Sequence, residues 1–222
     1  CHFLTIVDPD YPSTLKSKTY RPPFVLFYYG DISLTNDPNK CLAVVGTRNP
    51  TEYGVRITKE LSSELSNDFI IVSGMAKGID SIAHRSAIDA GNKTIAVIGS
   101  GIDNCYPLEN KELYKELKLN HLIISEYFGD VSPDQNHFPS RNRIIAGLCK
   151  ATLITEAKNH SGTSITAGHA LAFSRTVMAV PTTADSGSVC NRLIKEGAVL
   201  IETAKDVLDE LNDIPFVEEE IQ

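Results

Sequence analysis

Short apolar runs alternate with amphipathic stretches along most of this chain. The runs are rich in β-branched residues and several end in glycine or proline, which is typical of buried strands. After FVLFYYG at 24–30, they occupy residues 42–46, 69–74, 93–101, 121–128, 151–157, 176–181 and 198–204.

The stretches between these runs have the spacing of amphipathic helices. We expect helices over residues 55–67, 75–91, 107–120, 141–150, 164–175, 190–197 and 205–212. Strands that alternate with helices of this length predict a parallel sheet, and right-handed crossovers place the helices on both of its faces. The predicted fold class is therefore α/β, with a doubly wound, mostly parallel sheet.

Residues 1–40 break this alternation, with prolines at positions 9, 12, 22 and 23. We predict that they form an N-terminal extension packed on the core, that residues 41–211 form the main domain, and that residues 212–222 form an acidic tail. The extension contains Phe24, Phe27, Tyr28 and Tyr29. These rings would suit base stacking, but buried aromatic residues are common, so core packing is the favoured interpretation.

Composition and charge restrict the function. The formal net charge is −7, which argues against a protein held on nucleic acid by its overall charge. A nucleic-acid site would need a local cluster of arginine and lysine. The five cysteines are scattered without a CxxC pair, so we expect no zinc site and no disulfide framework. Cys41 and Cys149 have apolar neighbours and are expected to be packed thiols.

The sequence offers no sign of a membrane or of export. No apolar run reaches the length of a membrane span, and no charged and apolar leader opens the chain. The cysteine usage suits a reducing compartment. We therefore expect a cytoplasmic protein with no membrane partner.

Glycine, serine and threonine gather where the predicted strands end. In an open parallel sheet, functional loops lie beyond the carboxyl ends of the strands. Several such loops on one edge predict an extended groove for an anionic ligand. The loops are GTR (46–48), SGMAKGID (73–80), GSG (99–101), SEY (125–127) and EAKNHSGT (156–163).

The turn at Gly46, Thr47 and Arg48 leads from a strand into a helix. This geometry points backbone N–H groups at an anion, and Arg48 adds a planar set of donors. The alternative is a tight turn with a solvated arginine. The loop at 73–80 has two equally weighted interpretations. Lys77 would suit a phosphate, whereas the two glycines would shape the loop and Asp80 would cap the next helix. Ser161, Gly162 and Thr163 suit an anion or a helix cap.

The stretch HFPSRNRIIAG at 137–147 places Phe138 close to Arg141, Asn142 and Arg143. An aromatic ring among arginines suits single-stranded nucleic acid, because a base stacks on the ring while guanidinium groups contact the backbone. The alternative is a core phenylalanine followed by a helix whose arginines face solvent. On an acidic protein, physical chemistry alone slightly favours that alternative.

Catalytic patterns are weak. The sequence lacks GxGxxG after the first strand of the main domain, the P-loop motif and a GxSxG elbow, and its histidines have no metal-ligand spacing. Glu126 and Glu156 end strands that we expect to be adjacent, so they would suit an acid and base pair. Each would equally suit a helix cap or an arginine partner.

Taken together and in this order, several stretches resemble the successive motifs of the DNA-processing protein A family (DprA, also called Smf). The resemblance runs from about Tyr11 to about Leu211. The motifs are VVGTRNPTEYG, SGMAKGIDSIAH, KTIAVIGSGIDNCYP, SEYFG, HFPSRNRIIAGL and EAKNHSGTSITAGHAL.

The resemblance implies an extended Rossmann-like fold that binds single-stranded DNA. Proteins of this family protect incoming strands during natural transformation and help to load the RecA recombinase on them. They act as homodimers and have no established catalytic activity. The resemblance thus implies a non-enzymatic protein without a cofactor, whose partners are single-stranded DNA, RecA and a second copy of itself.

The family's site residues carry over to matching positions of this chain. The resemblance implies that Gly46, Thr47 and Arg48 hold a phosphate and that Lys77 is a weaker contact. It assigns the rest of the strand path to Phe138, Arg141, Asn142, Arg143, Ser161, Gly162 and Thr163.

Two points leave room for other interpretations. The family's fold is similar to that of nucleotide-processing phosphoribohydrolases, so the alternative is a hydrolase of nucleoside monophosphates with Glu126 or Glu156 as the acid or base. Proteins of the family often carry a basic residue after the YP of GSGIDNCYP, whereas Leu108 and Glu109 stand here.

Overall fold

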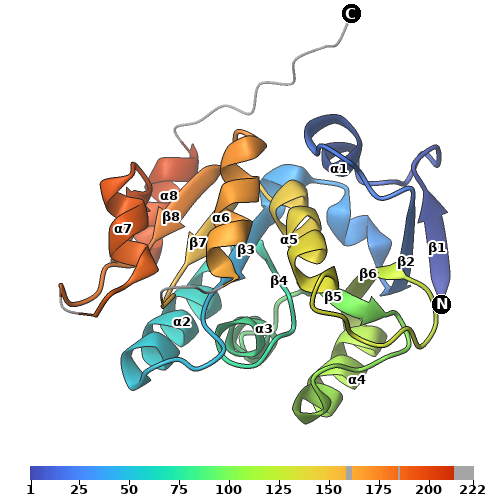
Figure 1. The fold of residues 1–222 in the computed structure, drawn as a ribbon, viewed down its shortest axis with the longest axis horizontal. Coiled ribbons are helices and arrows are strands. Elements are labelled where there is room, and N and C mark those ends of the chain that lie inside the picture. Colours follow the sequence, from blue (N-terminus) through green and yellow to red (C-terminus); the bar gives the residue numbers. More distant parts are fainter. Residues whose placement is uncertain (159–161, 185, 213–222) are drawn as a thin grey trace, which may run out of the picture.

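A sheet of nine strands runs through the part of the chain that the computed structural model describes, residues 1–158, 162–184 and 186–212 (Figure 1). Its spatial order is β1-β2-β6-β5-β4-β3-β7-β8-β9. The strands are β1 (His2–Thr5), β2 (Val25–Gly30), β3 (Cys41–Val45), β4 (Ile70–Ser73), β5 (Thr94–Gly101), β6 (Leu122–Tyr127), β7 (Ala151–Ile154), β8 (Thr176–Ala179) and β9 (Val199–Leu200).

Helices cover both faces of this sheet. Side chains of α1, α5, α6 and α7 pack in the hydrophobic core on one face, and those of α2, α3, α4 and α8 pack on the other. The predicted doubly wound, mostly parallel α/β fold is confirmed. The helices are α1 (Ser13–Lys18), α2 (Glu52–Leu65), α3 (Ile79–Asp89), α4 (Lys111–Asn120), α5 (His137–Leu148), α6 (Thr163–Ala172), α7 (Val189–Lys195) and α8 (Ala204–Asn212).

The strand order reverses direction at β3. From β3 the chain moves outward through β4, β5 and β6, then returns to place β7 on the other side of β3, and all these pairings are parallel. Helices from the two halves therefore leave β3 and β7 on opposite faces. A crevice opens at the carboxyl ends of strands at such a reversal.

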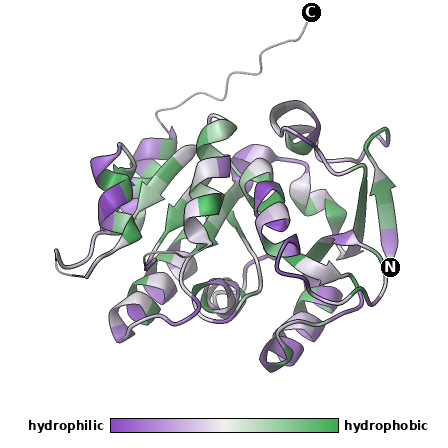
Figure 2. Cartoon of the chain, in the orientation of Figure 1, coloured by the Kyte–Doolittle hydropathy of each residue, from purple (hydrophilic) through white to green (hydrophobic). Residues whose placement is uncertain are grey.

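The strand β3 is central to both cores. All five of its residues, Cys41–Val45, are buried. Leu42 and Val44 pack toward α2 and α3, whereas Ala43 and Val45 belong to the core that includes α5. This alternation follows from the two-residue period of a strand. Figure 2 shows the same distribution, with hydrophobic central strands and hydrophilic turns on the outer helices.

Four helices begin three or four residues from the expected start, namely α2 at Glu52, α3 at Ile79, α4 at Lys111 and α5 at His137. The helix α3 begins at Ile79 rather than at 75, because Met75 (φ +57°) and Gly78 (φ +79°) both adopt left-handed conformations that interrupt a helix. The helix α5 begins at His137 rather than at 141. Pro139 suggests a break in the sequence, yet proline is tolerated in the first turn of a helix.

The N-terminal segment adds two antiparallel strands to the edge of the sheet. In Figure 1, β1 and β2 lie at the end next to β6, and Phe27 of β2 pairs with Ser125 of β6. The expectation that the aromatic residues here are all core is wrong for Phe24, which is 79% exposed. Phe24 precedes β2 and is fixed by its carbonyl oxygen, which accepts a hydrogen bond from the Ile6 N–H, rather than by its ring.

Two further expectations concern the thiols and the ends of the chain. Cys41 and Cys149 are fully buried, as predicted, and burial raises the pKa of the Cys41 thiol to about 12.

Residues 213–222 of the predicted acidic tail lie outside the described residues. Among the residues that are described, none of the helices combines the length and the apolar character needed to cross a bilayer.

The buried His84 of α3 makes the stability of the fold sensitive to acid. Its Nδ1 lies 2.7 Å from the Thr94 hydroxyl, and that hydroxyl donates to the Ile71 carbonyl, so Nδ1 carries the proton. The other ring nitrogen is buried without a partner in the described chain. Burial, together with nearby His121 and Arg141, lowers the pKa of His84 to about 3.

We therefore expect the free energy of unfolding to fall as the pH drops below about 6.5, the pKa of an unfolded histidine. Only the unfolded state binds the proton between that pH and about 3. The slope for this group is at most ~1.4 kcal/mol per pH unit. Urea unfolding at pH 7.0 and 5.0 should show a larger loss in the wild type than in His84→Gln. The exposed His2→Gln should behave as wild type, and equal losses in all three proteins would contradict the assignment.

Candidate functional site

A groove of about 690 Å³ lies at the reversal point of the sheet, where β3, β7 and the start of α5 meet. A side pocket of about 270 Å³ adjoins it, and both are lined by Arg48, Tyr106, Phe138 and Arg141. Most of the residues that the sequence nominates line one or both. The groove is lined by Gly46, Thr47, Arg48, Phe138, Arg141, Asn142, Gly162 and Thr163, and the side pocket adds Lys77.

The turn after β3 is tied down by its own backbone. The Thr47 N–H donates to the Glu156 carbonyl at 2.7 Å, and the Thr47 carbonyl accepts from the Ile79 N–H at 3.1 Å. A Cβ at Gly46 would lie 2.6 Å from the Glu156 carbonyl oxygen. Only glycine fits there, because the turn is pressed between β7 and α3. The Thr47 amide is thus already used within the protein.

Arg48 projects from this turn over an aromatic pair. Its guanidinium carbon lies 5.3 Å from the centroid of the Phe138 ring, a cation–π contact. The Phe138 ring lies 5.9 Å from the Tyr106 ring, centroid to centroid. Arg48 is exposed and Phe138 is half-buried, so both can reach a ligand. The structure therefore brings together the arginine and the aromatic ring that the sequence proposes.

Tyr106 was missed by the sequence reasoning. It is 44% exposed and lines both the groove and the side pocket. A signal for it was present, because it stands in the motif KTIAVIGSGIDNCYP, directly after one of the glycine-rich strand ends. A Cβ at Gly99 would come within 3.0 Å of the Phe138 ring, so the glycine of that strand end makes room for the aromatic pair.

Arg141 is buried beneath the groove rather than exposed in it. Only 5% of it is exposed, and Nη1 donates to the carbonyl oxygens of Gly74 and Val97. Its Nε donates to the Asn142 side chain at 3.1 Å. Burial lowers the pKa of Arg141 to about 10, and Asp80 opposes this shift. The guanidinium thus ties the residue after β4 and the middle of β5 to α5.

Asp80, in the first turn of α3, is a second buried charge in the lining. Its carboxylate accepts from the Ala76 N–H at 3.3 Å. Burial raises the pKa of this carboxyl, and Arg141 acts in the opposite direction. Asp80 therefore braces the loop before α3, but it does not cap that helix, because the N-cap is Gly78 and no side chain caps it. Asp80 also moderates the positive charge beneath the groove.

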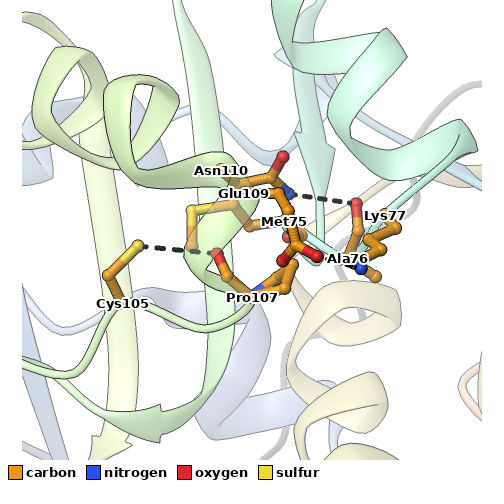
Figure 3. Close-up of polar contacts among 7 residues, drawn as sticks. All are labelled: Met75, Ala76, Lys77, Cys105, Pro107, Glu109 and Asn110. Atoms are coloured by element: carbon orange, nitrogen blue, oxygen red, sulfur yellow. Dashed lines mark hydrogen bonds and ion pairs between the residues drawn. The ribbon is translucent and has the colours of Figure 1, made fainter.

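The loop after β4 is held from the start of α4 (Figure 3). The Asn110 side-chain amide donates to the Met75 carbonyl at 2.8 Å, which supports the left-handed backbone of Met75. On the same side, the Lys77 ammonium forms an ion pair with Glu109. Both charged groups are more than half exposed, and the hydrogen bond from Lys77 lowers the pKa of Glu109. Lys77 thus reaches the side pocket already paired.

The structure separates Arg143 from the other nominated residues. Its Nη2 lies 2.7 Å from the Glu126 carboxylate, and it lines neither the groove nor the side pocket. Asn142 does line the groove, and its amide donates to the Gly162 carbonyl at 3.4 Å. Ser161 lies outside the described residues, so its position cannot be compared.

The expectation that Glu126 and Glu156 end adjacent strands is wrong. Glu126 is in β6 and Glu156 follows β7, and β5, β4 and β3 lie between those strands. The strands β6 and β7 follow each other in the chain but are not neighbours in the sheet, because the chain crosses the sheet between them to begin its second half. Glu126 pairs with Arg143, and Glu156 accepts from the Thr51 N–H and hydroxyl. The two carboxylates cannot act as one acid and base pair.

Comparisons with known proteins found a matching family model and similar proteins. A family model described as DNA recombination-mediator protein A matches residues 2–212. The DNA processing protein DprA of Streptococcus pneumoniae is 44% identical over 93% of this chain and 73% of its own length.

Solved structures are similar as well. The X-ray structure of DprA from Streptococcus pneumoniae has a TM-score of 0.90 at 43% identity, covering 94% of this chain and 74% of that one. A structure of DNA processing protein A from Helicobacter pylori, described by its single-stranded DNA binding mode, has a TM-score of 0.85 at 30% identity. It covers 95% of this chain and 96% of that one.

The buried position of Arg141 leads to a prediction about stability. Arg141→Met should lower the free energy of unfolding by about 2–4 kcal/mol, because the carbonyl oxygens of Gly74 and Val97 lose their donor. Arg48→Met, which changes an exposed arginine of the same groove, should cost less than about 0.5 kcal/mol. Urea unfolding compares the two. Equal midpoints would show that Arg141 does not hold Gly74 and Val97 to α5.

Proposed function

This chain belongs to the DNA recombination-mediator protein A family, and on that premise we propose that it binds single-stranded DNA in the groove at the reversal point of its sheet. The observation that carries the proposal is the Arg48 guanidinium 5.3 Å from the Phe138 ring centroid, at the rim of a preformed groove. A cation beside an aromatic face is the combination that holds a phosphate and a stacked base together.

Each part of the groove has a separate task in this proposal. Arg48 contacts a phosphate, and a base stacks on Phe138 and Tyr106, whose rings form one aromatic platform. The helix α6 begins at Thr163, and the N–H groups of Thr163 and Ser164 donate to none of the described residues, so they can donate to another phosphate. Contacts of this kind read the backbone and the ring face, so binding is largely independent of base sequence.

The four nominated residues of α5 have different roles in this proposal. Arg141 and Asn142 shape the groove from beneath, since both are buried and hydrogen-bonded to the protein. Phe138 alone of the α5 candidates contacts the strand by stacking. Arg143 acts at a distance, by pairing with Glu126 and fixing α5 against β6.

We further propose that the protein works without catalysis, in the cytoplasm, as a homodimer that delivers single strands to RecA. Support for the non-enzymatic part comes from the separation of Glu126 and Glu156 across the sheet. The hydrolase alternative would need one of them to act alone. Dimerisation would let two modest sites hold one strand, which raises the overall affinity by avidity.

Arg48→Ala should weaken binding of fluorescent oligo-dT roughly tenfold at low salt, because one charge-assisted phosphate contact is lost. The slope of log K against log salt should also become shallower by about 0.7. Lys205→Ala removes the same charge from α8, which contributes nothing to the groove lining, and serves as the control. If both variants bind as wild type, the strand does not pass Arg48.

The same protein preparation separates binding from hydrolysis. Incubation with nucleoside monophosphates should release no free base, whereas the hydrolase alternative requires release that disappears in Glu126→Gln or Glu156→Gln. Oligo-dT retention without turnover supports the proposal, and turnover without retention overturns it.

The ion pair at the side pocket predicts a variant with stronger binding. Glu109→Gln should free Lys77 for a phosphate, so oligo-dT should bind about two- to fivefold more tightly and the salt slope should steepen by about 0.7. Glu112→Gln, which frees Lys115 on the exposed side of α4, changes the net charge equally. Equal gains in the two variants would mean that only overall charge matters and that Lys77 does not contact the strand.

A further inference from the structure

A second cavity, of about 660 Å³, lies beside the groove at the carboxyl ends of β7 and β8. We call it the polar pocket and define it by Thr51, Tyr53, Glu156, Lys158, Thr182 and Ser188. Lys158 lines both this pocket and the groove, so the two spaces adjoin at its side chain. Of the described residues nominated from the sequence, Glu156 alone lines it.

Hydrogen bonds hold the walls of the polar pocket in place. The Tyr53 hydroxyl donates to the Pro181 carbonyl at 3.0 Å, which ties α2 to the loop after β8. The Asn191 side chain accepts from the Thr182 N–H at 2.9 Å and donates to the Thr182 carbonyl at 2.8 Å. Lys158 and Ser188 form an antiparallel bridge at the opposite wall. The cavity is thus preformed, as binding sites for small groups commonly are.

Glu156 is the only carboxylate among the described residues that line this pocket. It is 8% exposed, and its Oε2 accepts from the Thr51 N–H at 3.0 Å and from the Thr51 hydroxyl at 3.1 Å. Gly54 packs directly against that oxygen. Oε1 accepts no hydrogen bond from the described residues. The pocket therefore offers a fixed, negatively charged acceptor that has room for one more donor.

The Glu156 carboxylate determines which part of a nucleotide can enter the polar pocket. A carboxylate accepts hydrogen bonds and repels phosphate, so the phosphate stays in the groove, on the Lys158 side. The base can enter, because the pocket volume exceeds that of a nucleobase and Tyr53 supplies an aromatic wall. Carboxylates recognise the amino group of cytosine, N4–H₂. Thymine offers only a ring N–H between two carbonyl oxygens, which the carboxylate repels.

We propose that the polar pocket receives one base of the bound strand and that Glu156 accepts a hydrogen bond from its exocyclic amino group, which gives a preference for cytosine over thymine. The inference rests on the proposed binding of single strands in the groove. It adds a specificity-determining residue to a site that otherwise contacts phosphates and ring faces.

The test compares fluorescent oligo-dC and oligo-dT of equal length by anisotropy at one salt concentration. The wild type should bind oligo-dC about three- to tenfold more tightly, the effect of one charge-assisted hydrogen bond. Glu156→Gln keeps an acceptor for Thr51 and should lose most of that preference. Glu52→Gln is the control, because it removes the same charge from the start of α2, next to Thr51, at a residue that does not line the pocket. This variant should keep the preference for oligo-dC.

A second variant tests the cavity without altering Glu156. Thr183→Trp places a large side chain at the pocket wall and should abolish the preference while oligo-dT binding persists. The Thr183 hydroxyl forms no hydrogen bond with the described residues, and its carbonyl keeps its partners in the variant. Equal binding of the two oligonucleotides by the wild type overturns this inference and leaves the groove proposal standing. Failure to bind either one overturns the groove proposal itself.

Discussion

The buried guanidinium of Arg141 is the interaction on which the candidate site depends. It reaches from α5 to the carbonyl oxygens of Gly74, directly after β4, and of Val97, in the middle of β5. Both residues are buried, where a carbonyl oxygen needs a hydrogen-bond donor. A side chain at position 74 would clash with the guanidinium, so the contact requires glycine there. Since Phe138 lies one turn earlier on the same helix, the contact that secures Gly74 and Val97 also sets the aromatic ring at the groove.

Positively charged side chains gather at the candidate site although the whole chain is acidic. The chain carries a formal net charge of −7, yet Arg48, Lys77, Arg141 and Lys158 line adjoining cavities on one edge. Acidic groups offset two of these cations. Asp80 opposes the pKa shift of Arg141, and Glu109 pairs with Lys77. Arg48 is left as the exposed cation beside an aromatic ring, which concentrates the positive potential at the rim where a polyanion would arrive.

The differences between expectation and structure have specific causes. Local periodicity located the described strands except β1 and the described helices except α1, because the repeat of buried positions is present in each segment. It failed at α3 and α5, where Met75, Gly78 and Pro139 act through backbone geometry that side-chain patterns do not record. The expectation that Glu126 and Glu156 end adjacent strands was also wrong, because the order of strands along the chain does not determine which strands pair in the sheet.

By itself the sequence determined the α/β alternation, the glycine-rich strand ends and the motifs of the family, all of which depend on residues close together in the chain. Only the tertiary structure decided which nominated side chains share a surface. It placed Arg48 over Phe138, turned Arg143 toward Glu126 and buried Arg141 beneath the groove. Those outcomes depend on the order in which strands pair and on which face each helix covers, and both are set by packing between segments that are distant in the sequence.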